Sequence, residues 1–187
     1  AVRLYGQNNT EGSVDITTRM AGRFNLDNVL ASVAIARSFG VTESNIRSVL
    51  EQFVPPENRS EVFDWGSNRV FNDNSPSTAV GLVASLDSFL EFPAERRLLI
   101  FGDIPGLGRE EREIHQEIFE KVAVIPSAKA VYVGPKIYHY RDSRKGLFFR
   151  SPQAFYEWIS GQAIEETFIF VKGFTRLNLL EPFRPAG

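Results

Sequence analysis

From residue 62 onward the sequence alternates between short apolar runs and amphipathic stretches, and few folds accommodate such an alternation. Leu98-Leu99-Ile100-Phe101 is a continuous apolar run, which is typical of a strand buried on both faces. The later stretch Glu110–Val122 carries apolar residues at helical spacing with charges opposite them. Because strands that alternate with helices form mainly parallel sheets, we predict an α/β, Rossmann-like fold with helices on both faces of the sheet.

The stretch Arg69–Leu86 is predicted to form a strand, a polar elbow and a helix over about residues 76–91. Ser75 suits the N-cap of this helix and Pro76 suits its first position. Free N–H groups at a helix start attract anions, and Asp73 is placed to accept hydrogen bonds from hydroxyls such as those of a ribose. An ordinary βα turn is the alternative. The apolar residues expected to face the core are Val80, Leu82, Val83 and Leu86.

The first 54 residues follow a different pattern. Two short strands near the N-terminus precede two helices, of which the second has Thr42 as its N-cap. Pro55-Pro56 ends the helical pair, so we predict a domain boundary there, with domains at 1–54 and 55–187. The two strands make no convincing domain by themselves, so we expect the sequence to start within a larger one.

Composition excludes several classes of function. The 187 residues carry a net charge of −2, so no nucleic-acid partner is expected. No apolar run is long enough to span a membrane and no signal peptide is evident, so we predict a cytoplasmic protein without membrane insertion. Cysteine is absent and only two histidines occur, so we predict no metal site of thiolates or several histidines and assign no metal ligand, although carboxylates could still hold Mg²⁺. The sequence also lacks the G-x-x-x-x-G-K-[ST] phosphate-binding loop.

Three predicted strands end in glycine-containing polar segments: Gly102-Asp103, Gly134-Pro135 and Lys172-Gly173. The carboxyl ends of parallel strands meet at one edge of a sheet, where open α/β sheets bind ligands. We therefore expect the side chains that carry chemistry to gather near one crevice. The alternative for His115 is a solvated position on a charged helix, and the alternative for Lys172 is an ammonium reaching solvent from a strand end. The four residues expected to lie near this crevice are Asp73, Asp103, His115 and Lys172.

The order of several motifs resembles the C-terminal region of Mur ligases, the ATP-dependent amide-forming ligases of bacterial peptidoglycan synthesis, over about residues 15–181. Gly22–Asn28 is similar to the G-x-[HF]-N-x-x-N that enters the last helices of the central ATPase domain. Asn58–Glu61 is similar to the interdomain G-R-x-E, and Asn72–Ser75 to [DN]-D-S-[YK]. The resemblance implies that residues 1–54 are a strand–helix–helix remnant of that ATPase domain. It also implies nucleotide-binding roles: Asn28 for adenine, Arg59 for phosphates and Asp73 for the ribose.

Two further motifs complete the resemblance. The segment Gly102–Gly108 with the downstream His115 is similar to G-D-M-x-E-L-G and its histidine, and Val171-Lys172-Gly173 is similar to V-K-G-S-R. Positions in and beside these loops shape the pocket for the incoming amine in the family. The resemblance therefore implies amine-substrate-binding roles for Ser75, Ser77, Thr78, Asp103, His115 and Lys172.

The family's reaction implies what this chain contributes and what it lacks. ATP phosphorylates a substrate carboxylate, and an amine then attacks the acyl phosphate; the P-loop lysine and Mg²⁺ that serve this step lie on the central domain. We expect a fragment that presents the amine of an amino acid or of D-Ala-D-Ala and closes over ATP. The acceptor in the full-length enzyme would be a UDP-N-acetylmuramoyl peptide. The fragment alone is expected to hold no catalytic residue, to bind neither ATP nor Mg²⁺, and to be inactive.

Departures from the family pattern leave alternatives open. Ser75 replaces the family's Tyr or Lys, and Thr78-Ala79 replaces the Asn-x-Pro that follows it. Phe174-Thr175 replaces the Ser-Arg after K-G, and Asn58 replaces the Gly before the interdomain Arg. A degenerate, non-catalytic Mur-like binding module is therefore one alternative. A folylpolyglutamate-synthase-like ligase is another, although residues 73–76 do not match its D-x-A-H-N-P loop. A free-standing dinucleotide-binding domain is disfavoured because no G-x-G-x-x-G follows the first parallel strand.

Overall fold

The computed structural model describes residues 2–4, 14–18, 20–23, 25–55, 59–74, 79–104, 106–173 and 175–184. The chain divides into two compact units, residues 1–56 and 57–187, which are considered separately. The predicted division after residue 54 lies close to this one. That the first unit is the end of an ATPase domain stays a prediction.

The first unit contains a strand pair and two helices. Strands β1 (Val2–Leu4) and β2 (Val14–Ile16) pair in antiparallel fashion. Helices α1 (Asn25–Ser38) and α2 (Glu43–Gln52) follow, and the Thr42 side chain caps α2 by accepting the Asn45 N–H at 3.4 Å as predicted. The small core of this unit comprises Ile16, Val29, Val33 and Ile46.

The second unit is built on a six-stranded sheet in the order β3-β4-β8-β5-β6-β7. Only the hairpin of β3 and β4 pairs in antiparallel fashion, and the other neighbours are parallel, which confirms the predicted mainly parallel sheet. The strands are β3 (Glu61–Trp65), β4 (Asn68–Asn72), β5 (Arg97–Gly102), β6 (Ala128–Val133), β7 (Leu147–Phe149) and β8 (Phe168–Lys172).

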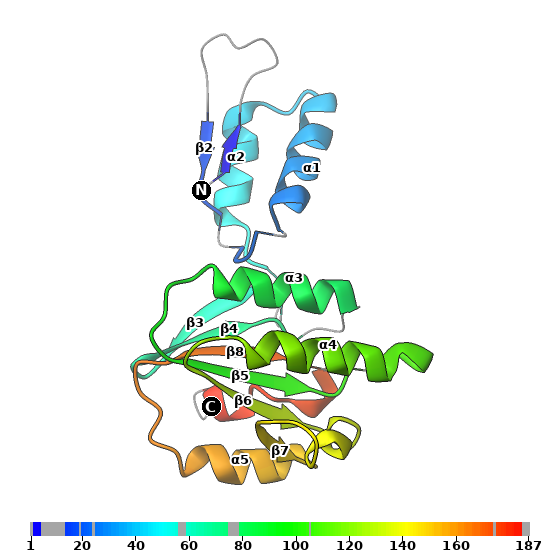
Figure 1. The fold of residues 1–187 in the computed structure, drawn as a ribbon. Coiled ribbons are helices and arrows are strands. Elements are labelled where there is room, and N and C mark those ends of the chain that lie inside the picture. Colours follow the sequence, from blue (N-terminus) through cyan, green and yellow to red (C-terminus); the bar gives the residue numbers. More distant parts are fainter. Residues whose placement is uncertain are drawn as a thin grey trace. The chain divides into compact units, whose positions relative to one another are not determined.

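Helices cover both faces of this sheet, as predicted (Figure 1). Helices α3 (Ala79–Leu90) and α4 (Glu111–Ala123) lie on one face, where Phe89 stacks on Phe168 with ring centroids 4.5 Å apart. Helix α5 (Pro152–Ser160) and two short 3₁₀ turns, Thr175–Leu177 and Glu181–Phe183, lie on the other. The buried residues of the second face are aliphatic on the strands: Val70, Leu98, Ile100, Val131, Val133, Ile169 and Val171.

Helix α3 confirms part of its predicted buried face. Leu82 and Leu86 are buried, and with Phe89 they form a stripe at the spacing of one helix face. Val80 was expected on the same face, but it is 79% exposed. It lies two positions before Leu82, roughly 200° around the helix, and therefore points away from the sheet. Ser75 and Pro76, the predicted cap residues, lie outside the described residues.

Two glycines allow a close approach at the carboxyl ends of β5 and β8. A Cβ atom on Gly102 would lie 2.8 Å from Leu177 Cδ1, 2.9 Å from Leu179 Cδ1 and 3.2 Å from the Gly173 Cα. The chain after β8 thus packs directly on backbone at this point. Because these two positions carry no side chain, Leu177 and Leu179 can pack against the ends of the strands and cover the core there.

We expect the substitution Gly102→Ala to lower the free energy of unfolding by about 1–3 kcal/mol, because the added methyl overpacks a closed contact. The two tryptophans, Trp65 and Trp158, both belong to the second unit, so urea unfolding followed by their fluorescence reports this unit. Gly161→Ala is the control, since its Cβ would meet nothing nearer than 3.6 Å. Equal losses in the two variants would contradict this packing.

Candidate functional site

Five buried polar residues gather where β4 and β8 end and β3 begins. Buried polar side chains usually have hydrogen-bond partners, so we expect these five residues to contact one another or the nearby backbone. We call them the edge cluster: Ser60, Asn72, Asp73, Asn74 and Lys172.

An ion pair lies at the centre of the edge cluster. The Lys172 Nζ donates to Asp73 Oδ2 at 2.5 Å, and the side chains are only 3% and 9% exposed. The residues are 99 positions apart in sequence, but β4 and β8 are parallel neighbours and Asn72 lies opposite Val171. The Asp73 N–H also donates to the Val171 carbonyl at 3.0 Å. Sheet pairing therefore brings the two charges together.

The second carboxylate oxygen of Asp73 holds the segment that enters the sheet. Asp73 Oδ1 accepts the Ser60 N–H at 3.3 Å. Ser60 has φ 52°, in the left-handed region that non-glycine residues seldom occupy. Arg59, the residue before it, is exposed. Asp73 thus links the end of β4 to the backbone beside Arg59.

Asn72 shapes the elbow that follows β4. Its side-chain oxygen accepts the Asn74 N–H at 3.1 Å, which closes a local turn, and its Nδ2 donates to Glu61 Oε2 at 3.0 Å. The predicted polar elbow is therefore held by side-chain hydrogen bonds on both sides of Asp73.

Asp103 ends the neighbouring strand β5 and binds backbone. Its carboxylate accepts the N–H groups of Lys136 at 3.1 Å and Ile137 at 2.9 Å. A Cβ on Gly134, which has φ 140°, would lie 2.3 Å from the Asp103 Cγ. Glycine is thus needed for the carboxylate to reach these donors, which begin the 3₁₀ turn Ile137–Tyr140. This capping contact leaves Asp103 partly exposed at the strand edge.

His115 is completely buried, so the solvated position considered from the sequence is wrong. It shares the inner face of α4 with Ile118, Phe119 and Val122, at spacings of three, four and seven residues. Its ring centroid lies 5.4 Å from that of Tyr140 and 6.5 Å from that of Phe119. Neither ring nitrogen has a hydrogen-bond partner within the described residues.

Burial lowers the pKa of His115 below its ordinary value. Glu111 and Asp103 act in the opposite sense, and Lys136 adds to the lowering, but desolvation of the ring dominates. Lys136 itself is exposed, and its hydrogen bond to Glu111 Oε2 at 2.6 Å raises the pKa of its ammonium. His115 is therefore neutral at neutral pH.

The strand order places the predicted site residues as neighbours along one edge of the sheet. Asp73, Lys172 and Asp103 follow or end the adjacent strands β4, β8 and β5. His115 packs beneath rings near this edge and is closed to solvent. Asn28 lies in the first unit, is exposed and donates to Asn25 Oδ1 at 3.2 Å. Ser75, Ser77 and Thr78 lie outside the described residues.

Exposed charge at this edge includes Arg59. Its guanidinium takes part in no ion pair within the described residues. Over the described ranges, no three His, Asp or Glu residues gather in the way that a metal ion needs. The described part of the chain also has no helix with the length and apolar character needed to cross a bilayer.

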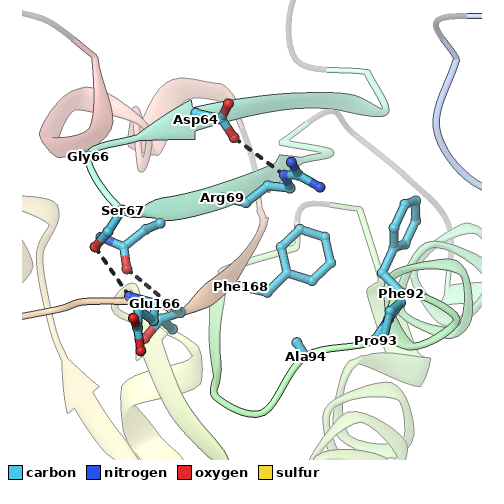
Figure 2. A pocket seen from close by; sticks show the side chains of 11 residues that line it. Asp64, Gly66, Ser67, Arg69, Phe92, Pro93, Ala94, Glu166 and Phe168 are labelled. Atoms are coloured by element: carbon cyan, nitrogen blue, oxygen red, sulfur yellow. Dashed lines mark hydrogen bonds and ion pairs between the residues drawn. The ribbon is translucent and has the colours of Figure 1, made fainter.

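A pocket of about 480 Å³ lies at the opposite edge of the sheet, where β4 and β8 begin (Figure 2). Phe92 and Phe168 form its apolar wall, and an exposed ion pair between Asp64 and Arg69, 3.3 Å long, lies at its rim. It was not predicted from the sequence, because its residues come from strand ends and turns without a recognisable motif. It contains none of the predicted site residues.

Comparison with known proteins identifies the relatives of this chain. No family model matches it. A UDP-N-acetylmuramoyl-tripeptide–D-alanyl-D-alanine ligase from Synechocystis sp. is 29% identical over 121 residues, which are 64% of this chain and 26% of that protein. A UDP-N-acetylmuramoylalanine–D-glutamate ligase from Listeria monocytogenes is 38% identical over 71 residues, which are 37% of this chain and 16% of that protein. The chain thus spans about a quarter of the first relative's length and less of the second.

The fold agrees with these relatives. The crystal structure of a MurF ligase from Thermotoga maritima in complex with ADP covers 98% of this chain and 45% of its own, with a TM-score of 0.76 and 17% identity. Fold and sequence together define the class: a Rossmann-like α/β module similar to Mur ligases, consistent with their C-terminal region. Within that class, the motifs point to the ligases that add D-alanyl-D-alanine to a UDP-N-acetylmuramoyl tripeptide. The Synechocystis relative confirms this resemblance.

We expect Lys172→Met to lower the free energy of unfolding of the second unit by about 3–5 kcal/mol, because it leaves the Asp73 carboxylate buried without its partner. Urea unfolding followed by tryptophan fluorescence measures this. Arg69→Met is the matched control; it breaks the exposed pair with Asp64 and should cost at most about 1 kcal/mol. A loss for Lys172→Met no larger than the control's would show that the pair is not buried in solution.

The lowered pKa of His115 predicts a dependence of stability on pH. The unfolded chain binds a proton on this histidine more readily than the folded chain does. The contribution of His115 to the free energy of unfolding is therefore complete above the unfolded pKa of about 6.5, and it is lost as the pH falls toward the folded pKa. His115→Phe should therefore show a smaller loss of unfolding free energy between about pH 7 and about pH 5 than the unchanged protein. His139→Asn, at an exposed position, should behave like the unchanged protein. Equal losses in all three proteins would refute this assignment.

Proposed function

We propose that this chain is the C-terminal part of an ATP-dependent, amide-bond-forming ligase of peptidoglycan precursor synthesis. The observation that carries the proposal is the sequence similarity to two Mur ligases, together with the described motif residues at the carboxyl edge of the sheet. In this proposal the longer protein joins a UDP-N-acetylmuramoyl peptide to an amino acid or dipeptide. The chain closes over the nucleotide and presents the amine.

Three residues are proposed to contact the nucleotide. The exposed guanidinium of Arg59 suits the phosphates, because it is unpaired among the described residues and forms paired hydrogen bonds with phosphate oxygens. Asp73 is the motif position proposed for the ribose. Its side chain is 9% exposed and both carboxylate oxygens are engaged by Lys172 and Ser60, so only their remaining lone pairs can accept a ribose hydroxyl. Asn28 offers a side-chain amide for adenine. ATP would supply the phosphoryl group that activates the acceptor carboxylate.

The amine side of the site stays a proposal based on motif positions. The motif positions are Ser75, Ser77, Thr78, Asp103, His115 and Lys172, and the burial of Lys172 argues against direct contact for that residue. The burial of His115 favours support of the strand edge over direct contact with a substrate. The two reported relatives use different amine donors according to their names, D-alanyl-D-alanine and D-glutamate, so either class is a reasonable first choice in an assay.

Mg²⁺ is proposed to bind elsewhere in the longer protein. The acids of the described residues do not gather into a site for it. The P-loop is likewise missing from this sequence, so we propose that the chain alone does not ligate. A cytoplasmic location remains a prediction, in keeping with a nucleotide-dependent reaction.

A second candidate is a non-catalytic Mur-like binding module. The departures at Ser75 and Phe174-Thr175 favour it, since they fall in loops that shape the amine pocket in the family. A folylpolyglutamate-synthase-like ligase is a further alternative with the same type of chemistry. ATP turnover by the longer protein would exclude the non-catalytic binding module. The substrate that supports this turnover would distinguish a Mur-type ligase from a folylpolyglutamate-synthase-like one.

The test is phosphate release from ATP by the full-length protein, with D-alanyl-D-alanine and single amino acids offered as amine donors and UDP-N-acetylmuramoyl peptides as acceptors. We expect donor-dependent release, and Arg59→Ala should lower kcat/KM for ATP about tenfold or more through lost phosphate contacts. Arg47→Ala, at an exposed pair with Glu51 on α2, is the control and should leave the rate unchanged. No release with any donor would refute the ligase and favour the binding module.

A further inference from the structure

Lys172 is badly placed to bind a substrate. Its side chain is only 3% exposed, and its one partner among the described residues is Asp73 Oδ2. An ammonium that binds a substrate carboxylate must reach the surface, whereas this one ends inside the sheet edge. Its charge is already balanced by Asp73, so it offers little attraction to a second anion.

Asp73 joins this lysine to the entry of the second unit. One carboxylate oxygen accepts from Lys172 and the other accepts from the Ser60 N–H at 3.3 Å. Ser60 is buried and has φ 52°, a conformation that needs support from its surroundings. The residue whose direction this turn sets is Arg59, which is exposed. Contacts therefore run from Lys172 through Asp73 to the backbone of Ser60, which is covalently joined to Arg59.

We propose that Lys172 is a positioning residue: by fixing the Asp73 carboxylate it holds the left-handed turn at Ser60 and so aims Arg59 at the nucleotide phosphates. This proposal rests on the proposed function for the role of Arg59, but not for the line of contacts itself. Without the ammonium, a buried carboxylate has a strong drive to turn toward water and to release the Ser60 N–H. On this view Lys172 acts on the ATP side of the reaction and not on the amine.

The line of contacts is tested in the 187-residue chain by amide hydrogen exchange at Ser60. We expect exchange at Ser60 in Lys172→Met to accelerate at least about tenfold more than exchange at the Leu99 amide in β5, because the overall loss of stability affects both amides and the local release affects only Ser60. The double variant Asp73→Asn with Lys172→Met removes both charges and retains an acceptor oxygen, so it should restore protection of Ser60. Lys121→Met, which breaks an exposed pair with Asp87, is the control and should change nothing. Ser60 exchange that accelerates no more than Leu99 exchange in Lys172→Met, or a double variant no better than the single one, would overturn the proposal.

The role in catalysis is tested in the full-length protein. We expect Lys172→Met to raise KM for ATP about tenfold and to change KM for the amine donor less than about twofold. Adding Arg59→Ala should cause little further loss, because both changes disable the same contact. A rise in KM for the amine donor, or losses that multiply in the double variant, would show that Lys172 binds the substrate directly. If the full-length protein has no ATP-dependent turnover, the proposed function fails, and the exchange experiment still decides whether Lys172 holds Ser60.

Discussion

The pairing of a buried ammonium with a buried carboxylate constrains the carboxyl edge of this sheet more than any other described contact. Removing two charges from water is costly, and the attraction between Lys172 and Asp73 offsets that cost only because their atoms lie 2.5 Å apart. This separation requires β4 and β8 to be neighbours in the observed register. The ion pair therefore forms only in this arrangement of strands. It favours this strand order and register over others, in addition to stabilising the edge.

The same edge shows how a parallel sheet turns sequence separation into proximity. Asp73 and Lys172 are 99 residues apart, and Asp103 lies between them in sequence, yet all three lie at or directly after the ends of adjacent strands. Gly102 and Gly173 let the strand ends and the following chain approach closely. Polar contacts on one side of this point and aliphatic packing on the other hold the edge in place. Both kinds of contact therefore hold this edge, and Arg59 is exposed beside it.

Much of this arrangement follows from local sequence rules, and the exceptions have physical causes. The apolar run Leu98–Phe101 and the polar residues after each strand predict the parallel sheet and the gathering of polar side chains at one edge, because these patterns depend on the strand itself. The burial of His115 was missed because charged neighbours on α4 suggest a solvated helix, whereas the aromatic shelter comes from Tyr140 on a distant turn. The capping of a turn by Asp103 was also missed, because its partners, the N–H groups of Lys136 and Ile137, are distant in sequence. The motif gives the residue but not its partners, and the partners of a carboxylate decide whether it binds substrate or backbone.

Buried and exposed charges at this edge have different roles: the buried pair is structural, and the exposed charge is available to a ligand. Lys172 and Asp73 neutralise each other inside, while Arg59 remains charged at the surface. A phosphate group gains most from a cation that is exposed yet fixed in direction, because less conformational entropy is lost on binding. The departures from the Mur ligase pattern fall mainly in the segments after Asp73 and after Lys172, and one of them, Asn58 in place of a glycine, directly precedes Arg59. In the proposed function, loops that differ while the contacts of Arg59 stay the same allow different amine donors, and the two similar proteins are named for different donors.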